Sequence, residues 1–378
     1  METKPDYSPG LEGIVAGESA ISRIDLERNR LVIRGYDLVE LTEQVSYEEV
    51  AYLLLYGDLP GRGDLDRFNG DLRSERNLPD HIMDLLRQAP ASVHPMALLR
   101  TGVSALSFYD AEARDNSREA NVRKSIRLLA KIPLLIAAGH HLAGGREPVA
   151  PRPELSQAAN LLYLLRGVAP ADYEVEAMNA SLILYAEHGY NASAFAGRVT
   201  ASTQSDLHAA ITGAIGALAG SLHGGANEKA MEMLLEIGAP EKAEAWVLEG
   251  LRQRKKIMGF GHREYKKGDS RVPSMKKAAR RIDAHSGESR WVEIAEIVEM
   301  TMDREKGIFP NVDFPCAYTY YMMQIPIPLY TPIFVSSRVA GWAAHILEQN
   351  ENNRLIRPKH IYTGPEKLQV KPVDERGS

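Results

Sequence analysis

Apolar residues recur along most of this chain at the three- and four-residue spacing of an α-helix. Residues 47–56 place Val50, Leu53 and Leu54 on one face, and the pattern ends at Gly57-Asp58-Leu59-Pro60, a helix stop. Similar amphipathic patterns predict further helices over 81–88, 96–108, 119–142, 155–165, 174–187, 193–219, 227–236, 240–256, 290–303, 316–323 and 333–348. No alternation of strands with helices accompanies them, so the pattern predicts a mostly α fold without βαβ units.

Strand-like alternation is concentrated near the N-terminus. Within Ile14–Ile33, the stretches Ile21–Asp25 and Leu31–Ile33 have the composition of short strands and predict a hairpin.

Glycine- and proline-rich segments suggest how the helices are grouped. They lie at residues 144–151, 220–225 and 325–328. The last two bracket about a hundred residues, enough for an inserted lobe. We therefore expect a large domain over 1–220, a small domain over 221–325, and a return to the large domain over 326–378. The polar segment after Gln349 is expected to leave the body as an arm.

The charge balance and the cysteine content exclude several classes of function. The 378 residues carry 45 basic and 50 acidic side chains, a net charge of -5, which gives no general attraction to nucleic acid or to a membrane surface. A single cysteine, Cys316, excludes an internal disulfide and a cysteine-based metal cage. The N-terminus lacks an apolar leader and no long uncharged apolar run suggests a membrane span, so we expect a soluble cytoplasmic protein.

Two histidines stand beside glycines, where a ligand can approach the backbone closely. His223 precedes Gly224-Gly225, and His262 follows Gly261. A lone loop histidine is usually bonded to a carbonyl group. Two histidines in this setting make a shared pocket an equally good interpretation.

Asp313 allows two interpretations. It precedes a helical pattern, so its carboxylate is suited to cap that helix, and spacing alone favours this role. It also lies next to Phe314-Pro315, where burial would raise the pKa of the carboxylate and make it a better base.

Several cations also allow two interpretations. Arg338 lies on an otherwise apolar helical pattern, and Arg271 follows His262 by nine residues. Each is either half of a structural ion pair or a clamp for a carboxylate ligand. Arg357 is a solvated arm residue or a third such clamp. The basic residues around His262 form a solvated face or hold phosphates.

The chain as a whole resembles the citrate synthase family, in the short bacterial and archaeal form that includes 2-methylcitrate synthases. The resemblance covers nearly the whole chain, and its motifs occur in the expected order. They are Gly10–Ala16, Arg34–Asp37, Glu48–Leu54, His94–Met96, Glu187–Ser193, Ser221–Glu228, Gly259–Arg263, Asn311–Phe314, Thr331–Phe334, Ser337–Trp342 and Arg357–Lys359.

The resemblance implies an all-α homodimer in which a small helical domain closes over substrates bound to a large one. It also implies a reaction of the tricarboxylic acid cycle, the condensation of acetyl-CoA with oxaloacetate and water to citrate and CoA. No metal or additional cofactor is needed, because the coenzyme A thioester is itself a substrate. Propionyl-CoA is the alternative substrate, which would make the product 2-methylcitrate. A non-catalytic paralogue that binds CoA or a carboxylate is a second alternative.

The family's functional residues are carried over by motif. Asp313 resembles the base that removes a proton from the acyl group, His223 the donor to the thioester oxygen, and His262 the group that polarises the oxaloacetate carbonyl. The implied oxaloacetate ligands are His188, Arg271, Arg338 and Arg357, the last reaching into the partner subunit's site. The implied contacts to CoA are Lys256, Arg263 and Lys266.

The chain also departs from the family pattern. Pro315-Cys316-Ala317 stands where Tyr-Ser-Gly is common, directly after the implied base, and would reshape the acyl pocket. Tyr185 stands where histidine is common. Smaller departures occur at Gly189, Glu264 and Ser270.

Overall fold

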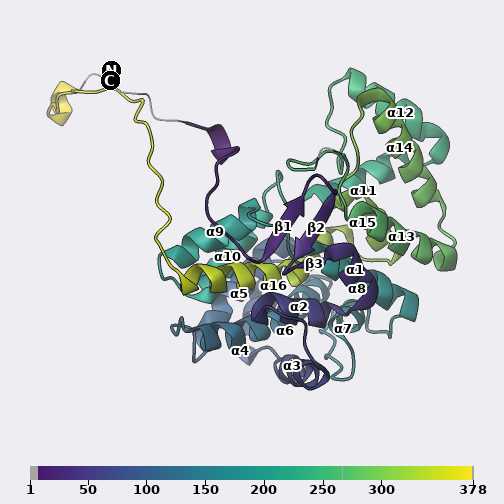
Figure 1. Ribbon diagram of the computed structural model, residues 1–378, viewed down its shortest axis with the longest axis horizontal. Helices are drawn as coiled ribbons and strands as arrows, with labels where there is room; N and C mark the ends of the chain where they lie inside the picture. Colours follow the sequence, from purple (N-terminus) through teal and green to yellow (C-terminus); the bar gives the residue numbers. More distant parts are fainter. Residues whose placement is uncertain (1–6, 266, 377–378) are drawn as a thin grey trace.

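The computed structural model describes residues 7–265 and 267–376, and they are mostly helical (Figure 1). The described part contains sixteen α-helices and one small sheet, which confirms the predicted fold class.

The sheet lies near the N-terminus, where the sequence predicts a hairpin. Strands β1 (Ser22–Asp25) and β2 (Arg30–Ile33) are antiparallel, and β3 (Tyr36–Asp37) adds to β2. Ile21, Leu31 and Ile33 are fully buried, so the sheet covers part of the helical core.

The larger group of helices surrounds α16 (Tyr330–Glu351), which is buried along most of its length. This helix contacts α6, α9, α2, α10 and α8. The other helices of this group are α1 (Leu38–Gln44), α2 (Tyr47–Tyr56), α3 (Arg62–Ser74), α4 (Asp80–Gln88), α5 (Pro95–Leu106), α6 (Arg118–Ala143), α7 (Gln157–Arg166), α8 (Asp172–Tyr185), α9 (Ala192–Ser202) and α10 (Leu207–Leu218).

Helix α6 is the one described helix that is long and apolar enough to cross a membrane. Of its most apolar window, 78% is buried inside the fold. Its apolar composition is therefore explained by packing against α16 and α5 rather than by lipid.

The second group comprises α11 (Ala226–Ile237), α12 (Pro240–Arg252), α13 (Val272–Ser286), α14 (Arg290–Lys306) and α15 (Asp313–Met322). Helix α15 packs on α11 and α13, and α12 packs on α14, to form the lobe at the right of Figure 1. Helix α13 also lies against α8 of the larger group. The domain boundaries at residues 220 and 325 stay a prediction.

Local signals explain where several helices begin and end. Ser46 and Glu49 form a capping box at the start of α2, and Gly57 ends this helix with φ +103°. The continuous helix predicted over 193–219 is wrong. The chain turns after Ser202, with Gln204 at φ +65°, and Asp206 caps α10 by accepting the N–H of Ala209.

Helices α1, α3 and α13 are missing from the sequence-based predictions. In α3, Phe68 and Leu72 are the buried side chains, so its apolar face is too narrow to stand out. The C-terminal arm, residues 352–376, leaves the body as an extended segment, as the polar composition predicts (Figure 1).

Candidate active site

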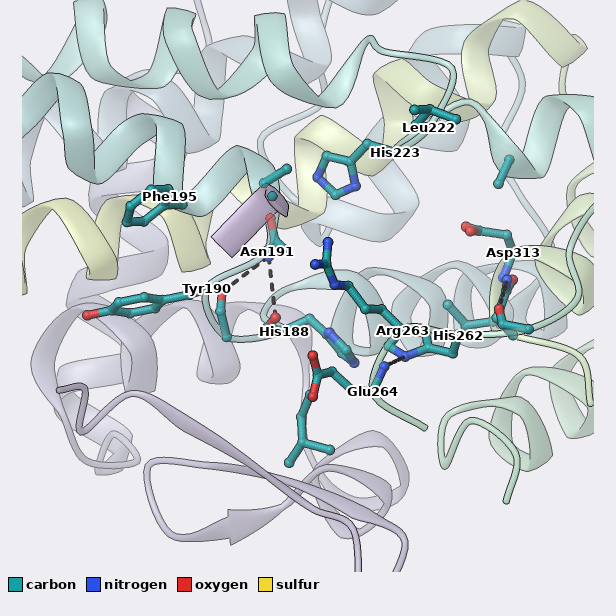
Figure 2. Close-up of a pocket in the computed structure, with 18 of the residues that line it drawn as sticks. His188, Tyr190, Asn191, Phe195, Leu222, His223, His262, Arg263, Glu264 and Asp313 are labelled. Atoms are coloured by element: carbon teal, nitrogen blue, oxygen red, sulfur yellow. Dashed lines mark hydrogen bonds between the residues drawn. The ribbon is translucent and has the colours of Figure 1, made fainter. Parts of the chain in front are cut away.

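A cavity of about 1080 Å³ lies where the two groups of helices meet. Figure 2 shows His188, His223, His262 and Asp313 around it. The lining side chains come from both helical groups and from the N-terminal segment. The predicted site residues among them are Lys256, His188, His223, His262, Arg263, Arg271, Asp313 and Arg338.

His223 lies in the turn between α10 and α11. A Cβ at Gly224 would come within 2.5 Å of the Leu218 carbonyl oxygen, so this turn requires glycine. The imidazole Nε2 lies 2.8 Å from the Ser193 hydroxyl. Burial, with a contribution from the charge of Arg338, lowers the pKa of His223 to about 4. The ring is therefore neutral near pH 7.

Ser193 fixes the orientation of that ring. Its Oγ accepts the indole N–H of Trp342 at 3.1 Å and donates its proton to Asn191 Oδ1 at 2.7 Å. Asn191 Oδ1 also accepts the backbone N–H groups of Ser193 and Ala194, as the N-cap of α9. The Ser193 hydroxyl is thus held by Asn191 and Trp342, and its contact with Nε2 orients the imidazole of His223.

His262 is oriented by its own loop. Its Nδ1 accepts the backbone N–H of Glu264 at 3.0 Å and that of Tyr265 at 3.1 Å. Since Nδ1 accepts two hydrogen bonds, the neutral ring carries its proton on Nε2. Gly259 has φ +78°, and a Cβ there would lie 2.7 Å from Phe314 Cβ, so glycine brings this loop against α15.

Asp313 is the first residue of α15, but its carboxylate does not cap the helix. Val312 occupies the cap position, and the Asp313 carboxylate accepts the Tyr185 hydroxyl at 2.6 Å. The capping interpretation of Asp313 is therefore wrong. Burial raises the pKa of Asp313 to about 6, although the Tyr185 hydrogen bond and the charge of Arg271 oppose the shift.

Arg271 is half of a buried ion pair and also lines the cavity. Its Nε and a terminal N–H donate to the two oxygens of Asp269, at 2.9 and 2.8 Å. Asp269 Oδ2 also accepts the backbone N–H of Val312 at 3.0 Å, next to Asp313. One carboxylate thus links Arg271 to the segment that carries Asp313.

Arg338 and His188 are buried with capacity for a ligand. Within residues 7–265 and 267–376, no carboxylate lies within ion-pair distance of Arg338, whose Nε donates to the Tyr185 carbonyl. Burial lowers the pKa of Arg338 to about 10, so it stays charged near pH 7. His188 is 8% exposed, and its Nε2 has no hydrogen-bond partner in the described part of the chain. Such orphaned polar groups are suited to a carboxylate ligand.

The remaining predicted contacts have different outcomes. Lys256 and Arg263 line the cavity, and Arg263 approaches the N-terminal segment at Gly10. Lys266 lies outside the described residues. Arg357 is exposed in the C-terminal arm and does not line the cavity of its own chain. Among the described residues, no group of three or more His, Cys, Asp or Glu side chains is arranged to hold a metal ion.

Three residues of the site carry roles that the sequence does not indicate. Ser193 holds His223, Asp269 holds Arg271, and Tyr185 holds Asp313. Cys316, in the unusual triplet after Asp313, is fully buried and does not line the cavity. The triplet therefore does not shape the acyl pocket by direct contact.

The chain is similar in sequence to known proteins along nearly its whole length. Residues 10–359 match the family model described as citrate synthase, C-terminal domain. The chain is 45% identical over 366 residues to a citrate/2-methylcitrate synthase of Bacillus subtilis, covering 97% of this chain and 98% of that protein. It is 43% identical to a 2-methylcitrate synthase of Mycobacterium tuberculosis, with 97% and 93% covered.

Among solved structures, it superposes on a citrate synthase from Thermoplasma acidophilum with a TM-score of 0.93. The two chains are 31% identical, and 98% of this chain and 100% of the other are covered. That structure is a ternary complex with carboxymethyl coenzyme A and oxaloacetate.

Proposed function

This chain belongs to the citrate synthase family and is an acyltransferase of that type, and we propose that its cavity joins the methyl carbon of acetyl-CoA to the carbonyl carbon of oxaloacetate. The observation that carries the proposal is one buried carboxylate and two oriented imidazoles around a single cavity that also holds buried arginines.

The first step is removal of a proton from the thioester methyl group by Asp313. The raised pKa of this carboxylate makes it a stronger base than an exposed aspartate. The methyl proton is a very weak acid, so a donor must stabilise the developing enolate oxygen. His223 is the donor that we propose for this oxygen, and one such donor contributes about 3 kcal/mol.

Carbon–carbon bond formation then uses His262. Its Nε2–H donates to the oxaloacetate carbonyl oxygen and protonates it as the new bond forms. His188, Arg271 and Arg338 hold the two oxaloacetate carboxylates, which is why several cations converge here. Water then hydrolyses the citryl thioester, releasing citrate and CoA.

The CoA part of the substrate would extend along Lys256 and Arg263. We propose that oxaloacetate binds first and that the helices of the small domain then close over it, which excludes water from the reactive thioester. Equal acetyl-CoA affinity with and without oxaloacetate in an equilibrium binding assay would refute this order.

The homodimer, with Arg357 in the partner's site, is also a proposal. The exposed arm that carries Arg357 supports it, since this arginine lies away from the cavity of its own chain. If the site is shared, mixing inactive Arg357→Ala and Asp313→Asn chains under exchange conditions restores part of the activity. A monomeric mass in solution, or no restoration, would contradict it. A cytoplasmic location stays a prediction.

Free-thiol release tests the reaction itself. Wild-type protein is expected to release CoA from acetyl-CoA only when oxaloacetate is present, and Asp313→Asn is expected to abolish the release. Asp303→Asn, which changes an exposed carboxylate on α14, is the matched control and should retain activity. Absence of oxaloacetate-dependent release in the wild type would favour the non-catalytic alternative.

2-Methylcitrate synthesis is the second candidate function. The similarity to 2-methylcitrate synthases supports it, at 43% identity for the Mycobacterium tuberculosis protein. A pocket distinguishes one methylene group by about 1–3 kcal/mol, so the two activities are expected to overlap. Comparing kcat/KM for acetyl-CoA and propionyl-CoA decides which is the principal substrate.

A further inference from the structure

Tyr185 connects three parts of the site at the end of α8. Its hydroxyl donates to Asp313 Oδ1 at 2.6 Å. Its ring packs on Phe334 with 4.3 Å between ring centroids, and its carbonyl oxygen accepts the Nε of Arg338. The side chain is 1% exposed, so it has little freedom to leave these contacts.

We propose that Tyr185 is a positioning residue for the base, holding the Asp313 carboxylate through Oδ1 so that Oδ2 takes the acyl-CoA proton. This inference rests on the proposed function and adds a residue to it. Proton transfer requires the acceptor oxygen to be held within hydrogen-bond reach of the carbon-bound proton, and a carboxylate with one oxygen fixed has only one remaining oxygen to present.

A buried phenol is suited to this role. Burial, with the charge of Asp313, raises the pKa of Tyr185 well above its ordinary value. The hydroxyl therefore stays protonated and keeps donating over the whole neutral range, whereas an imidazole in this place would itself titrate. The donated bond favours the ionised carboxylate, which is the form that acts as a base.

The other charged groups near Asp313 act through space. Arg271 and Arg338 favour the carboxylate, and Asp269 disfavours it. In the described part of the chain, Tyr185 is the residue whose side chain donates a hydrogen bond to this carboxylate. Cys316, on the same helix as Asp313, has its pKa raised to about 12 by burial, so its thiol is neutral. Removing the Tyr185 hydroxyl thus leaves the Asp313 carboxylate without the side chain that donates a hydrogen bond to it.

The unusual cysteine fits the same arrangement. Cys316 follows Asp313 by three residues on α15, and its thiol interacts with the Tyr185 hydroxyl. Four residues before Tyr185 on α8, the Ser181 hydroxyl lies 2.7 Å from the Tyr320 hydroxyl of α15. Helices α8 and α15 are therefore linked by the contacts Ser181–Tyr320 and Tyr185–Asp313. The triplet after Asp313 contacts the site through Tyr185 rather than by lining the cavity.

The test compares Tyr185→Phe with Tyr320→Phe. Both changes keep a buried ring and remove one hydroxyl between α8 and α15, but only the first removes a donor to Asp313. The readout is kcat against pH, followed by loss of thioester ultraviolet absorbance in the presence of oxaloacetate. In Tyr185→Phe the acidic limb should move to higher pH by about one unit, with about a tenfold loss of rate on that limb and recovery at high pH. Tyr320→Phe should leave the limb in place.

The inference is overturned if the acidic limb of Tyr185→Phe coincides with the wild-type limb, or moves no further than that of Tyr320→Phe, while wild-type protein condenses its substrates. A wild type without oxaloacetate-dependent turnover would instead refute the proposed function.

Discussion

Replacing Ser193 by alanine tests whether the imidazole of His223 is oriented by a neighbouring hydroxyl. Ser193 Oγ contacts His223 Nε2, Trp342 Nε1 and Asn191 Oδ1. The Asn191 cap keeps its two backbone donors in the variant, so the turn that begins α9 should persist. The main loss falls on the imidazole, whose ring is no longer oriented.

The magnitude follows from those contacts. A hydrogen bond between neutral groups contributes about 0.5–1.5 kcal/mol, and loss of the ring's orientation weakens enolate stabilisation worth about 3 kcal/mol. Each 1.36 kcal/mol changes the rate about tenfold, so kcat should fall by roughly ten- to a hundredfold. Leaving the buried Trp342 N–H unpaired should lower the free energy of unfolding by about 1–3 kcal/mol.

Thiol release and chemical denaturation measure these two effects separately. Ser125→Ala is the control, because the hydroxyl of Ser125 is buried on α6 and donates to the Asn121 carbonyl at 2.6 Å, away from the cavity. The control should retain kcat. If Ser193→Ala has a kcat within twofold of the control, the hydroxyl does not orient the imidazole and the reasoning fails.

Two further predictions concern stability. The folded-state pKa of Asp313, raised to about 6, lies above its unfolded value, so the ionised carboxylate destabilises the fold above that pH and the penalty vanishes as pH falls toward about 4. Asp313→Asn should therefore raise the free energy of unfolding by about 2–3 kcal/mol at about pH 8, and by little at about pH 4, in denaturant titrations. Gly341→Ala should destabilise by about 1–3 kcal/mol and raise KM for oxaloacetate, because its Cβ would lie 2.3 Å from the Ala186 carbonyl and 2.5 Å from Glu187 Oε2, beside His188. An unchanged melting temperature and KM would contradict that expectation.

The sequence predicts most helices because their apolar faces are broad. Helix α3 is missed because it buries few apolar side chains, and the break after Ser202 is missed because the apolar pattern of residues 193–202 resumes over 207–219. In such a stretch the helical period cannot locate a turn, and the Asp206 cap is the signal that does.

Some contacts within the site can also be predicted from the sequence, and others cannot. The imidazole of His262 is oriented by backbone N–H groups two and three residues further along the chain. A contact this local can be predicted from the sequence alone. The donor to Asp313 lies 128 residues away, and the partner of His223 lies 30 residues away. These pairs form only when separate helices pack, so the spacing of residues carries no trace of them.

Asp269 has a consequence for redesign of this site. Its carboxylate, 43 residues before Val312 in the sequence, joins Arg271 to the backbone of Val312, and both oxygens accept hydrogen bonds. The Asp269 side chain therefore couples the substrate-binding Arg271 to the segment that carries the base. Moving this site into another helical scaffold requires segments 269–271 and 311–313 to be moved together, with Tyr185 of α8 and Arg338 of α16 retained.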